Sequence, residues 1–486
     1  MKNLFVKLEG KSISYLFLFI MAVVFSLTSC CNDPDLLWHI KIGEEIIKTH
    51  TLSMADSFSW QSGLIWYQQE WLFDCFIYLV TLPFAGALFE VLYVLNNTLI
   101  LYLGMVYAKA KNKILYFCIS FYAFAFIPAN HSNRPIEFSV WIIFGLLWIY
   151  VGKFPLLSKA GLLLLGGILL SNFHGGMIVP FVGILLALIL VEVFLLWQKK
   201  TNIVVIRNYF LSLSAFMLGI MICPSGIALY RHLFVNIGSD TTSLITEWAP
   251  WQPGGMGMII IMVVLLSIGF HVRCESVPAA DYRRIGIILA VMAITFLYGA
   301  KGGTLLIFAV NYLSYPYIEA LFEHYFGKKV VSGYGYFTIM GIAVAYFFMF
   351  STDICESYFE KMNNYLPHKV ISLLKDELDK ENGDICIYND YLMGNFLLWN
   401  DIPCFVDSRQ VPYTKEFSEA GSVDDLFTLY TAAFDVTVFN QFFDKYEFDF
   451  ILESKEFYLK DYLLIRNDYM LLYDDGEIRL WRHSDP

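Results

Sequence analysis

The chain has 486 residues, of which 57% are hydrophobic and only 16% are charged. Soluble domains usually contain about 25% charged residues, so this composition excludes an ordinary soluble protein. Apolar runs at 136–151, 177–197 and 334–350 are about long enough to cross a hydrocarbon layer of about 30 Å. We therefore expect a membrane protein with several spanning helices.

The charged residues are unevenly distributed along the chain. Residues 351–486 contain 27 Asp and Glu against 12 Lys and Arg, a net charge of −15. Residues 1–350 contain 17 acidic and 21 basic residues, a net charge of +4, and the whole chain has −11. The sequence thus predicts a slightly basic transmembrane domain, 1–350, and an acidic soluble domain, 351–486. The acidic domain argues against a nucleic-acid partner.

The N-terminus is open to two interpretations. Lys2, Lys7 and Lys11 precede an apolar run at 13–27, which ends in Leu27-Thr28-Ser29-Cys30. This pattern fits a bacterial lipoprotein signal peptide cleaved before Cys30. An uncleaved first spanning helix has the same sequence pattern. We favour the spanning helix.

Basic residues predict the topology, because Lys and Arg concentrate on the cytoplasmic side of a membrane. With the N-terminus in the cytoplasm, the basic clusters at 109–113, 199–200 and 283–284 also lie inside. This arrangement requires that 72–84, which Asp74 and Pro83 interrupt, is an interfacial helix on the outer face. The expected spans, about eleven, are 13–30, 88–108, 114–128, 136–151, 160–171, 177–197, 208–223, 257–271, 285–299, 303–321 and 333–350. This topology puts the C-terminal domain, 351–486, on the outer, periplasmic side.

The first outer loop, 31–86, contains the most informative polar segment. It begins with Asp33-Pro34-Asp35 and His39, continues through Asp56-Ser57-Phe58-Ser59 and reaches Glu70-Trp71-Leu72. Ionisable groups at a membrane surface directly after a spanning helix point to function, although a solvated loop can also contain charges. The predicted topology places the candidate residues on this same outer face: Asp33, Asp35, His39, Glu70, Arg134, His174, Glu247 and Lys301.

The order of these motifs resembles the GT-C superfamily of membrane glycosyltransferases, which includes the lipid A aminoarabinose transferase and the protein O-mannosyltransferases. Asp33-Pro34-Asp35 stands where an acidic pair opens the family's first loop, and Gln69-Glu70-Trp71-Leu72 stands where its Glu motif begins. The Lys-Pro-Pro that follows in the family is missing here. A bacterial GT-C-like group is more similar, and its motifs match Asp33–His39, 56–59, 70–72, Arg134-Pro135, 172–176, Glu247-Trp248, 389–391 and 407–409 in order.

This resemblance implies an enzyme that transfers a hexose or pentose from a polyprenyl-phosphate donor at the outer, periplasmic face of a bacterial inner membrane. The acceptor is then a cell-envelope glycan, a glycolipid or a protein. The acceptor hydroxyl needs a general base, and a carboxylate is suited to that role. By position Asp33 is our first candidate and Asp35 the second, with Glu70 across from them. We expect no cofactor and no resident metal, although Asp33 and Asp35 as a divalent-cation site remain an alternative.

The donor phosphate needs cationic partners at the same face. Arg134, before Pro135 at a helix start, and Lys301 are the main candidates, because guanidinium and ammonium groups bind phosphate. His39 and His174 are further candidate donors, and Glu247 is a candidate for holding the acceptor. The alternatives are lipid-headgroup contacts for the cations and structural roles for the histidines.

Other functional classes are less consistent with the sequence. It contains no Gly-x-Ser-x-Gly elbow, P-loop or Gly-x-Gly-x-x-Gly, so a serine hydrolase or a nucleotide-using enzyme is not expected. A non-catalytic transporter or lipid-handling protein is the alternative function. It would place functional charges at mid-membrane depth, where this sequence has few.

The acidic domain shows alternating strand and helix patterns, which predict a small α/β domain on a partly parallel sheet. Strands are expected at 385–388, 403–406 and 448–453, with a hairpin of 470–473 and 478–482 that turns at Asp474-Asp475-Gly476. Helices are expected at 391–399 and 424–440, after an amphipathic segment at 368–380. Polar residues that follow strands either bind acceptor glycan or cap helices and fix turns: Asn389, Asp390, Asp407 and Arg409. Spacing also allows a Cys386–Cys404 disulfide.

Overall fold

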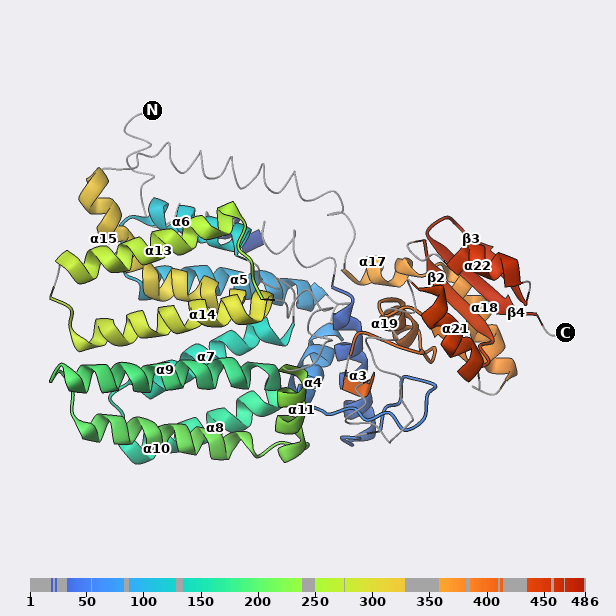
Figure 1. Cartoon of the computed structure of the whole chain (residues 1–486), viewed down its shortest axis with the longest axis horizontal. Helices are drawn as coiled ribbons and strands as arrows, with labels where there is room; N and C mark the ends of the chain where they lie inside the picture. The colour runs from blue at the N-terminus through green and yellow to red at the C-terminus, as the bar shows by residue number, and fades with distance from the viewer. Residues whose placement is uncertain are drawn as a thin grey trace. The chain divides into compact units, whose positions relative to one another are not determined.

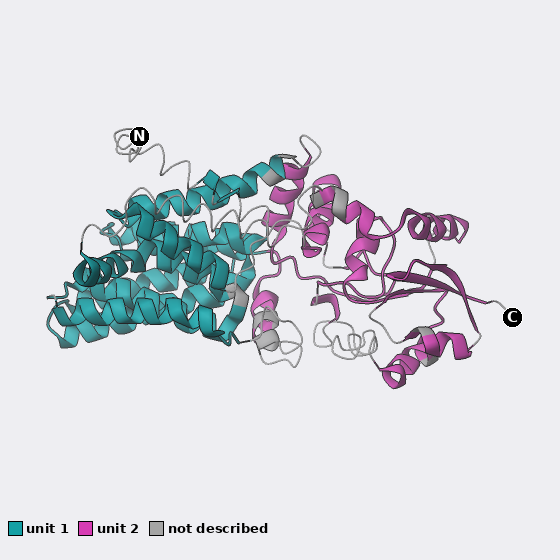
Figure 2. Cartoon of the chain, turned by 90° about the horizontal axis from the view of Figure 1, so that it is seen from above, with its two compact units in different colours: residues 1–31, 87–223, 245–355 teal, residues 32–86, 224–244, 356–486 magenta. Residues whose placement is uncertain are grey.

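The computed structural model describes residues 19–20, 22–23, 33–53, 55–82, 87–127, 134–237, 250–274, 276–327, 358–381, 385–409, 411–413, 435–455, 459–466 and 468–484. The chain forms two compact units (Figure 2). Unit 1 consists of 1–31, 87–223 and 245–355, and unit 2 of 32–86, 224–244 and 356–486. The first loop therefore folds with the acidic tail. The predicted division at 350/351 groups the loop with the spans instead, and it stays a prediction.

Unit 1 is helical in all of its described parts (Figure 1). Its helices are α5 (Ala87–Tyr107), α6 (Lys113–Phe126), α7 (Pro135–Val151), α8 (Leu156–Phe173), η3 (Gly175–Met177), α9 (Ile178–Trp197), α10 (Ile203–Ile220), α13 (Gly255–Cys274), α14 (Ala279–Phe308), η4 (Ala309–Ser314) and α15 (Tyr315–Phe326).

Among the described residues, five helical stretches are long and apolar enough to cross a membrane: Leu156–Phe173, Gly175–Trp197, Ile203–Ile220, Gly255–Cys274 and Gly302–Phe326. These stretches agree with a polytopic membrane fold. The expected count of eleven spans stays a prediction, because 13–30 and 333–350 lie almost entirely outside the described residues.

Small residues allow α8 and α10 to pack closely. A Cβ on Gly167 would lie 2.5 Å from the carbonyl oxygen of Phe216, and one on Gly219 would lie 2.1 Å from that of Leu164. Close backbone approach through small residues is the usual way in which helices associate in membranes, where no hydrophobic effect drives them together. The two helices form one of the closest pairs in unit 1.

The long helix α14 contains a break where the sequence predicts one. Gly299 has a non-helical backbone (φ 51°, ψ −127°), a left-handed conformation that favours glycine. Gly302 follows, and its carbonyl accepts a hydrogen bond of 2.9 Å from the hydroxyl of Thr295. The break thus separates the predicted spans 285–299 and 303–321.

Unit 2 combines helices with a four-stranded sheet. Its helices are α3 (Asp35–Thr49), α4 (Trp71–Thr81), α11 (Ile227–Ile237), α17 (Tyr358–Tyr365), α18 (His368–Lys380), α19 (Met393–Trp399), η5 (Val411–Tyr413), α21 (Val436–Lys445) and α22 (Leu459–Arg466). Its strands are β1 (Ile387–Asn389), β2 (Phe450–Ser454), β3 (Tyr469–Asp474) and β4 (Ile478–His483).

The sheet has the order β1-β2-β4-β3, with β1 and β2 parallel and the other pairs antiparallel. It is partly parallel, as expected, and the hairpin turns at the predicted Asp474-Asp475-Gly476. Residues 403–406 are not a strand: Cys404 forms only a single bridge, with Ser59 of the first loop. Cys386 and Cys404 are free thiols, so the disulfide that their spacing allows is not formed.

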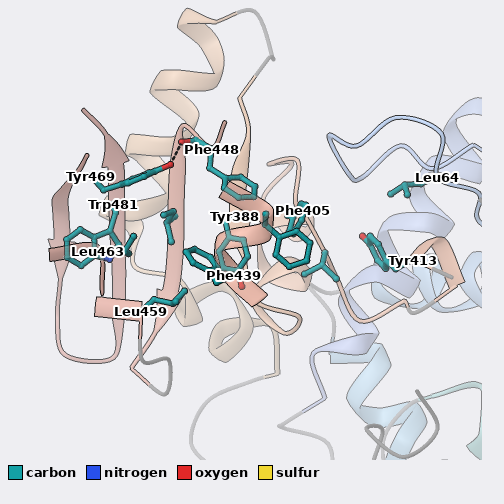
Figure 3. Close-up of a cluster of buried hydrophobic side chains, with 13 residues drawn as sticks. Leu64, Tyr388, Phe405, Tyr413, Phe439, Phe448, Leu459, Leu463, Tyr469 and Trp481 are labelled. Carbon is teal, nitrogen blue, oxygen red and sulfur yellow. Dashed lines mark hydrogen bonds between the residues drawn. The ribbon is translucent and has the colours of Figure 1, made fainter. Parts of the chain in front are cut away.

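The first loop and the tail share a hydrophobic core. Leu64 of the loop belongs to the buried cluster that contains Tyr388, Phe405 and Trp481 of the tail (Figure 3). A second cluster joins Trp38, Ile42 and Trp66 of the loop to Leu398 and Val411 of the tail. Because each part contributes large side chains to the same cores, neither can bury its apolar surface alone.

A buried ion-pair cluster further links the first loop to the tail, and we call this contact region the loop–tail joint. The guanidinium of Arg409 donates to Asp56 of the loop at 2.5 Å and to Asp407 at 2.6 and 2.9 Å, and all three side chains are almost fully buried. Tyr413 also donates to Asp407, at 2.9 Å. Burial alone would raise the pKa of Asp407, but the charge and hydrogen bonds of Arg409 hold it below its ordinary value.

Replacement of Arg409 by leucine tests the cluster. Removing one partner of a buried ion pair typically costs about 3–5 kcal/mol, and here two carboxylates would lose their cation. We expect hydrogen-exchange mass spectrometry to show a matching loss of protection in peptides covering 55–66 and 398–413. Arg466→Leu, at the partly exposed pair with Asp468, is the matched control and should cost less than about 1 kcal/mol. Equal effects of the two variants would contradict the prediction.

Acid should weaken the same joint. Since the pKa of Asp407 is lowered in the folded state, its stabilising contribution is present above the ordinary Asp value of about 3.9 and is lost as pH falls through the folded-state value.

Candidate functional site

The start of α3 positions the two predicted acidic residues. The backbone N–H of Asp35, the first residue of α3, donates to Oδ1 of Asp33 at 3.1 Å. A carboxylate at this end of a helix is stabilised by the helix dipole. Asp33 is buried, with 9% of its surface exposed, although it belongs to a loop. Burial of an acidic loop residue disfavours the interpretation of this segment as a merely solvated loop.

Helices α3 and α4 approach each other at a glycine. A Cβ on Gly43 would lie 2.0 Å from the carbonyl oxygen of Asp74, so only glycine permits this contact. His39 lies one turn before Gly43 on α3. Glu70, the residue directly before α4, lies one turn before Asp74, and residues four apart share a helix face. The close approach therefore brings His39, Glu70 and Asp74 together.

These three side chains form a buried cluster. Nδ1 of His39 is 2.5 Å from Oδ1 of Asp74, and Nε2 of His39 is 3.8 Å from Oε2 of Glu70. The exposed fractions are 2% for His39, 9% for Glu70 and 0% for Asp74. Burial, and then the neighbouring Glu70 carboxylate, raises the pKa of Asp74 well above its ordinary value. The cluster of His39, Glu70 and Asp74 therefore favours a state with one shared proton. A state with two ionised carboxylates beside a neutral imidazole is disfavoured.

Asp35 is held by the tail. Ser408 donates its hydroxyl to Oδ1 of Asp35 at 2.5 Å, and the amide of Asn395 donates to the same oxygen at 3.3 Å. Asn395 also accepts from the backbone N–H of Ser408 at 3.2 Å. Hydrogen bonds to a carboxylate stabilise its charged form and weaken it as a base.

In unit 1, two predicted phosphate ligands lie at the same helix, α7. Nδ1 of His174 lies 2.9 Å from the hydroxyl of Ser139 on α7, five residues after the partly buried Arg134 that precedes this helix. Glu137, in the first turn of α7, is 1% exposed. The start of α7 thus has a guanidinium before the helix and a carboxylate in its first turn, with an imidazole at Ser139, and a helix N-terminus favours anions.

The structure does not describe the side chains of the two remaining predicted site residues. Glu247 lies outside the described residues, as does the side chain of Lys301, whose backbone lies in α14 two residues after Gly299. Within the part of the chain that the structure describes, no group of three or more His, Cys, Asp or Glu side chains is placed to hold a metal ion.

The polar residues of the tail serve structural roles. Oδ1 of Asp390 accepts from the backbone N–H groups of Leu392 and Met393, at 2.9 Å each. The amide of Asn389 donates to the carbonyls of Asp390 and Val406, at 2.7 Å each. With Asp407 and Arg409 in the buried ion-pair cluster, these contacts support capping and turn roles over the binding of acceptor glycan.

Sequence reasoning missed several polar residues of these sites. Asp74 was interpreted only as an interruption of an apolar segment, although its i, i+4 spacing from Glu70 is a usable signal. Asn395 and Ser408 lie more than 350 residues from Asp35, and no local pattern points to that contact.

Comparison with known proteins gives the fold. No family model and no curated protein matches the chain. Among solved structures, the apo oligosaccharyltransferase of Archaeoglobus fulgidus aligns with a TM-score of 0.52 and 9% identity over 98% of this chain and 75% of its own. ArnT from Cupriavidus metallidurans aligns with TM-scores of 0.52 bound to undecaprenyl phosphate and 0.51 in the apo state, at 11% and 12% identity, over 96% of this chain and 97% of its own. The fold that the sequence motifs predict is thereby confirmed: the chain has a GT-C-like fold.

Proposed function

We propose that this protein is an integral membrane glycosyltransferase of the bacterial inner membrane. It transfers a sugar from a polyprenyl-phosphate donor to a glycan, lipid or protein acceptor on the periplasmic side. The main support is the end-to-end fold similarity to ArnT, one of whose structures contains undecaprenyl phosphate. The buried carboxylates of the first loop supply the chemistry that such a transfer needs.

Asp33 acts as the general base in this proposal. It is buried and lies directly before α3. By the resemblance to the GT-C enzymes, it stands where an acidic pair opens the first loop. Asp35 is the weaker candidate, because Ser408 and Asn395 both donate to its Oδ1. Its contacts suit an anchor between loop and tail. A divalent cation bound by these two residues remains the alternative role for the pair.

The donor phosphate binds at the N-terminal end of α7. Arg134 supplies a guanidinium suited to bidentate phosphate contacts, and the backbone N–H groups after Pro135 supply further dipole. His174, held by Ser139, adds a third donor. Lys301 completes the set in the proposal.

Asp33→Asn should abolish transfer while the protein still folds and inserts into the membrane. Asparagine keeps the size of the side chain but cannot accept the acceptor's proton, and general-base catalysis contributes about 10²- to 10⁴-fold. Mass spectrometry of envelope glycolipid and polysaccharide from gene-deleted cells, complemented with each variant, measures the result. Asp376→Asn, on the exposed face of α18, is the control and should restore the product. Full product from Asp33→Asn cells would exclude this base.

Arg134→Ala should weaken binding of undecaprenyl phosphate. A hydrogen bond to a charged group contributes about 1.5–3 kcal/mol, which corresponds to roughly a 10- to 100-fold rise in Kd. Binding of the fluorescent lipid to purified protein in nanodiscs measures this. Arg207→Ala, an exposed arginine at the start of α10, controls for a general loss of positive charge. If both variants bind like wild type, the phosphate does not bind at Arg134.

A further inference from the structure

The most deeply buried carboxylate of the α3–α4 cluster has no role in the proposed function. Asp74 has no exposed surface. Its Oδ1 lies 2.5 Å from Nδ1 of His39, while its Oδ2 has no hydrogen-bond partner within the described chain. An isolated buried carboxylate is costly, so its retention beside a histidine needs an explanation.

Aromatic side chains fix the ring of His39. Trp38 stacks on it with ring centroids 3.5 Å apart, and Phe73 contacts it edge-on at 5.1 Å. These two contacts restrain the ring, whose Nδ1 faces Asp74 and whose Nε2 faces Glu70, 3.8 Å away. The two ring nitrogens therefore face two different carboxyl groups.

We infer that Asp74 is a positioning residue that holds the Nδ1 proton of His39, so that Nε2 is the ring nitrogen that exchanges a proton with Glu70. In this exchange the O–H bond of a protonated Glu70 breaks and an N–H bond forms with the Nε2 lone pair. A Glu70 carboxylate and a His39 imidazolium result, and the Nδ1 proton stays in place. The inference deepens the proposed function and rests on it, with Glu70 as the further catalytic carboxylate that the family resemblance implies.

Charge explains why the exchange is favourable. The Nδ1 proton lies in the 2.5 Å contact with Asp74, and the imidazolium forms between two carboxylates, whose negative charges favour the protonated ring. Of the elements packed against α3, α4 adds Cys75, whose pKa burial and Asp74 raise to about 11, so it stays neutral. Helix α19 contains no titratable side chain. On α3 itself, Asp35 bonds to Ser408 and Lys41 pairs with Asp401.

Asp74→Asn tests the inference with little change of shape. The amide can turn its NH₂ toward Nδ1 and donate to it, which forces the ring proton onto Nε2 and removes the lone pair that faces Glu70. ¹⁵N-histidine solid-state NMR in lipid bilayers, with His39 identified by loss of its signal in His39→Gln, reads the protonated nitrogen. We expect wild type to keep Nδ1 protonated while Nε2 titrates, and Asp74→Asn to show the reversed tautomer. Its kcat should fall by about 10²-fold or more, with KM within about threefold.

The His271–Asp281 pair, 3.0 Å apart between α13 and the start of α14, provides the matched control. Asp281→Asn should leave kcat within about twofold of wild type. The inference fails if wild-type His39 is protonated on Nε2 alone when neutral, or if Asp74→Asn keeps the wild-type tautomer or kcat. The wild-type spectrum needs no enzymatic activity, and its assignment needs only that His39→Gln folds. Absence of transfer by the wild type would thus count against the proposed function, and the spectrum would still decide the role of Asp74.

Discussion

Arg409 lies between carboxylates from two distant parts of the sequence, and this buried ion-pair cluster is the constraint on which unit 2 depends. A guanidinium can be buried only when nearly all of its donors are satisfied, and Asp56 and Asp407 do this together. The loop and the tail must therefore adopt one relative arrangement before either is stable. That arrangement places Ser408, the residue before Arg409, against Asp35 at the start of α3.

In the candidate site, polar partners affect protonation as well as stability. Two of the predicted site residues in the first loop are held by other polar groups: the partly buried Asp35 by Ser408 and Asn395, and the buried His39 by Asp74. Burial makes their protonation states depend on their neighbours. Gly43 is as important as any charged residue here, since the backbone contact that it permits sets the distance between His39 and Asp74.

The sequence predicted what local patterns encode. The hairpin at Asp474-Asp475-Gly476 follows from turn chemistry, the break near Gly299 matches the boundary that the charge topology places at Lys301, and the GT-C-like fold follows from ordered motifs. The prediction of a strand at 403–406 was wrong, because the apolar residues there are buried by side-chain packing and not by pairing in a sheet. The N–H of Phe405 donates to the Asn389 side chain, not to a neighbouring strand. Helix α22 was missed because its sequence has little amphipathic periodicity. Asn395 and Ser408 were not predictable, since contacts across more than 350 residues leave no local signal.

The joint between loop and tail also has a consequence for synthesis. Asp56 and Arg409 are 353 residues apart, and ribosomes extend a chain by about 5–20 residues each second. In each new molecule, roughly 20–70 s therefore pass between synthesis of the first loop and synthesis of the segment that completes its core. Trp38, Trp66 and the acidic residues beside them are without their partners during that interval. The loop is thus the part of the nascent chain most in need of a chaperone, and a message truncated before Arg409 would produce a protein that can insert its spans and never complete unit 2.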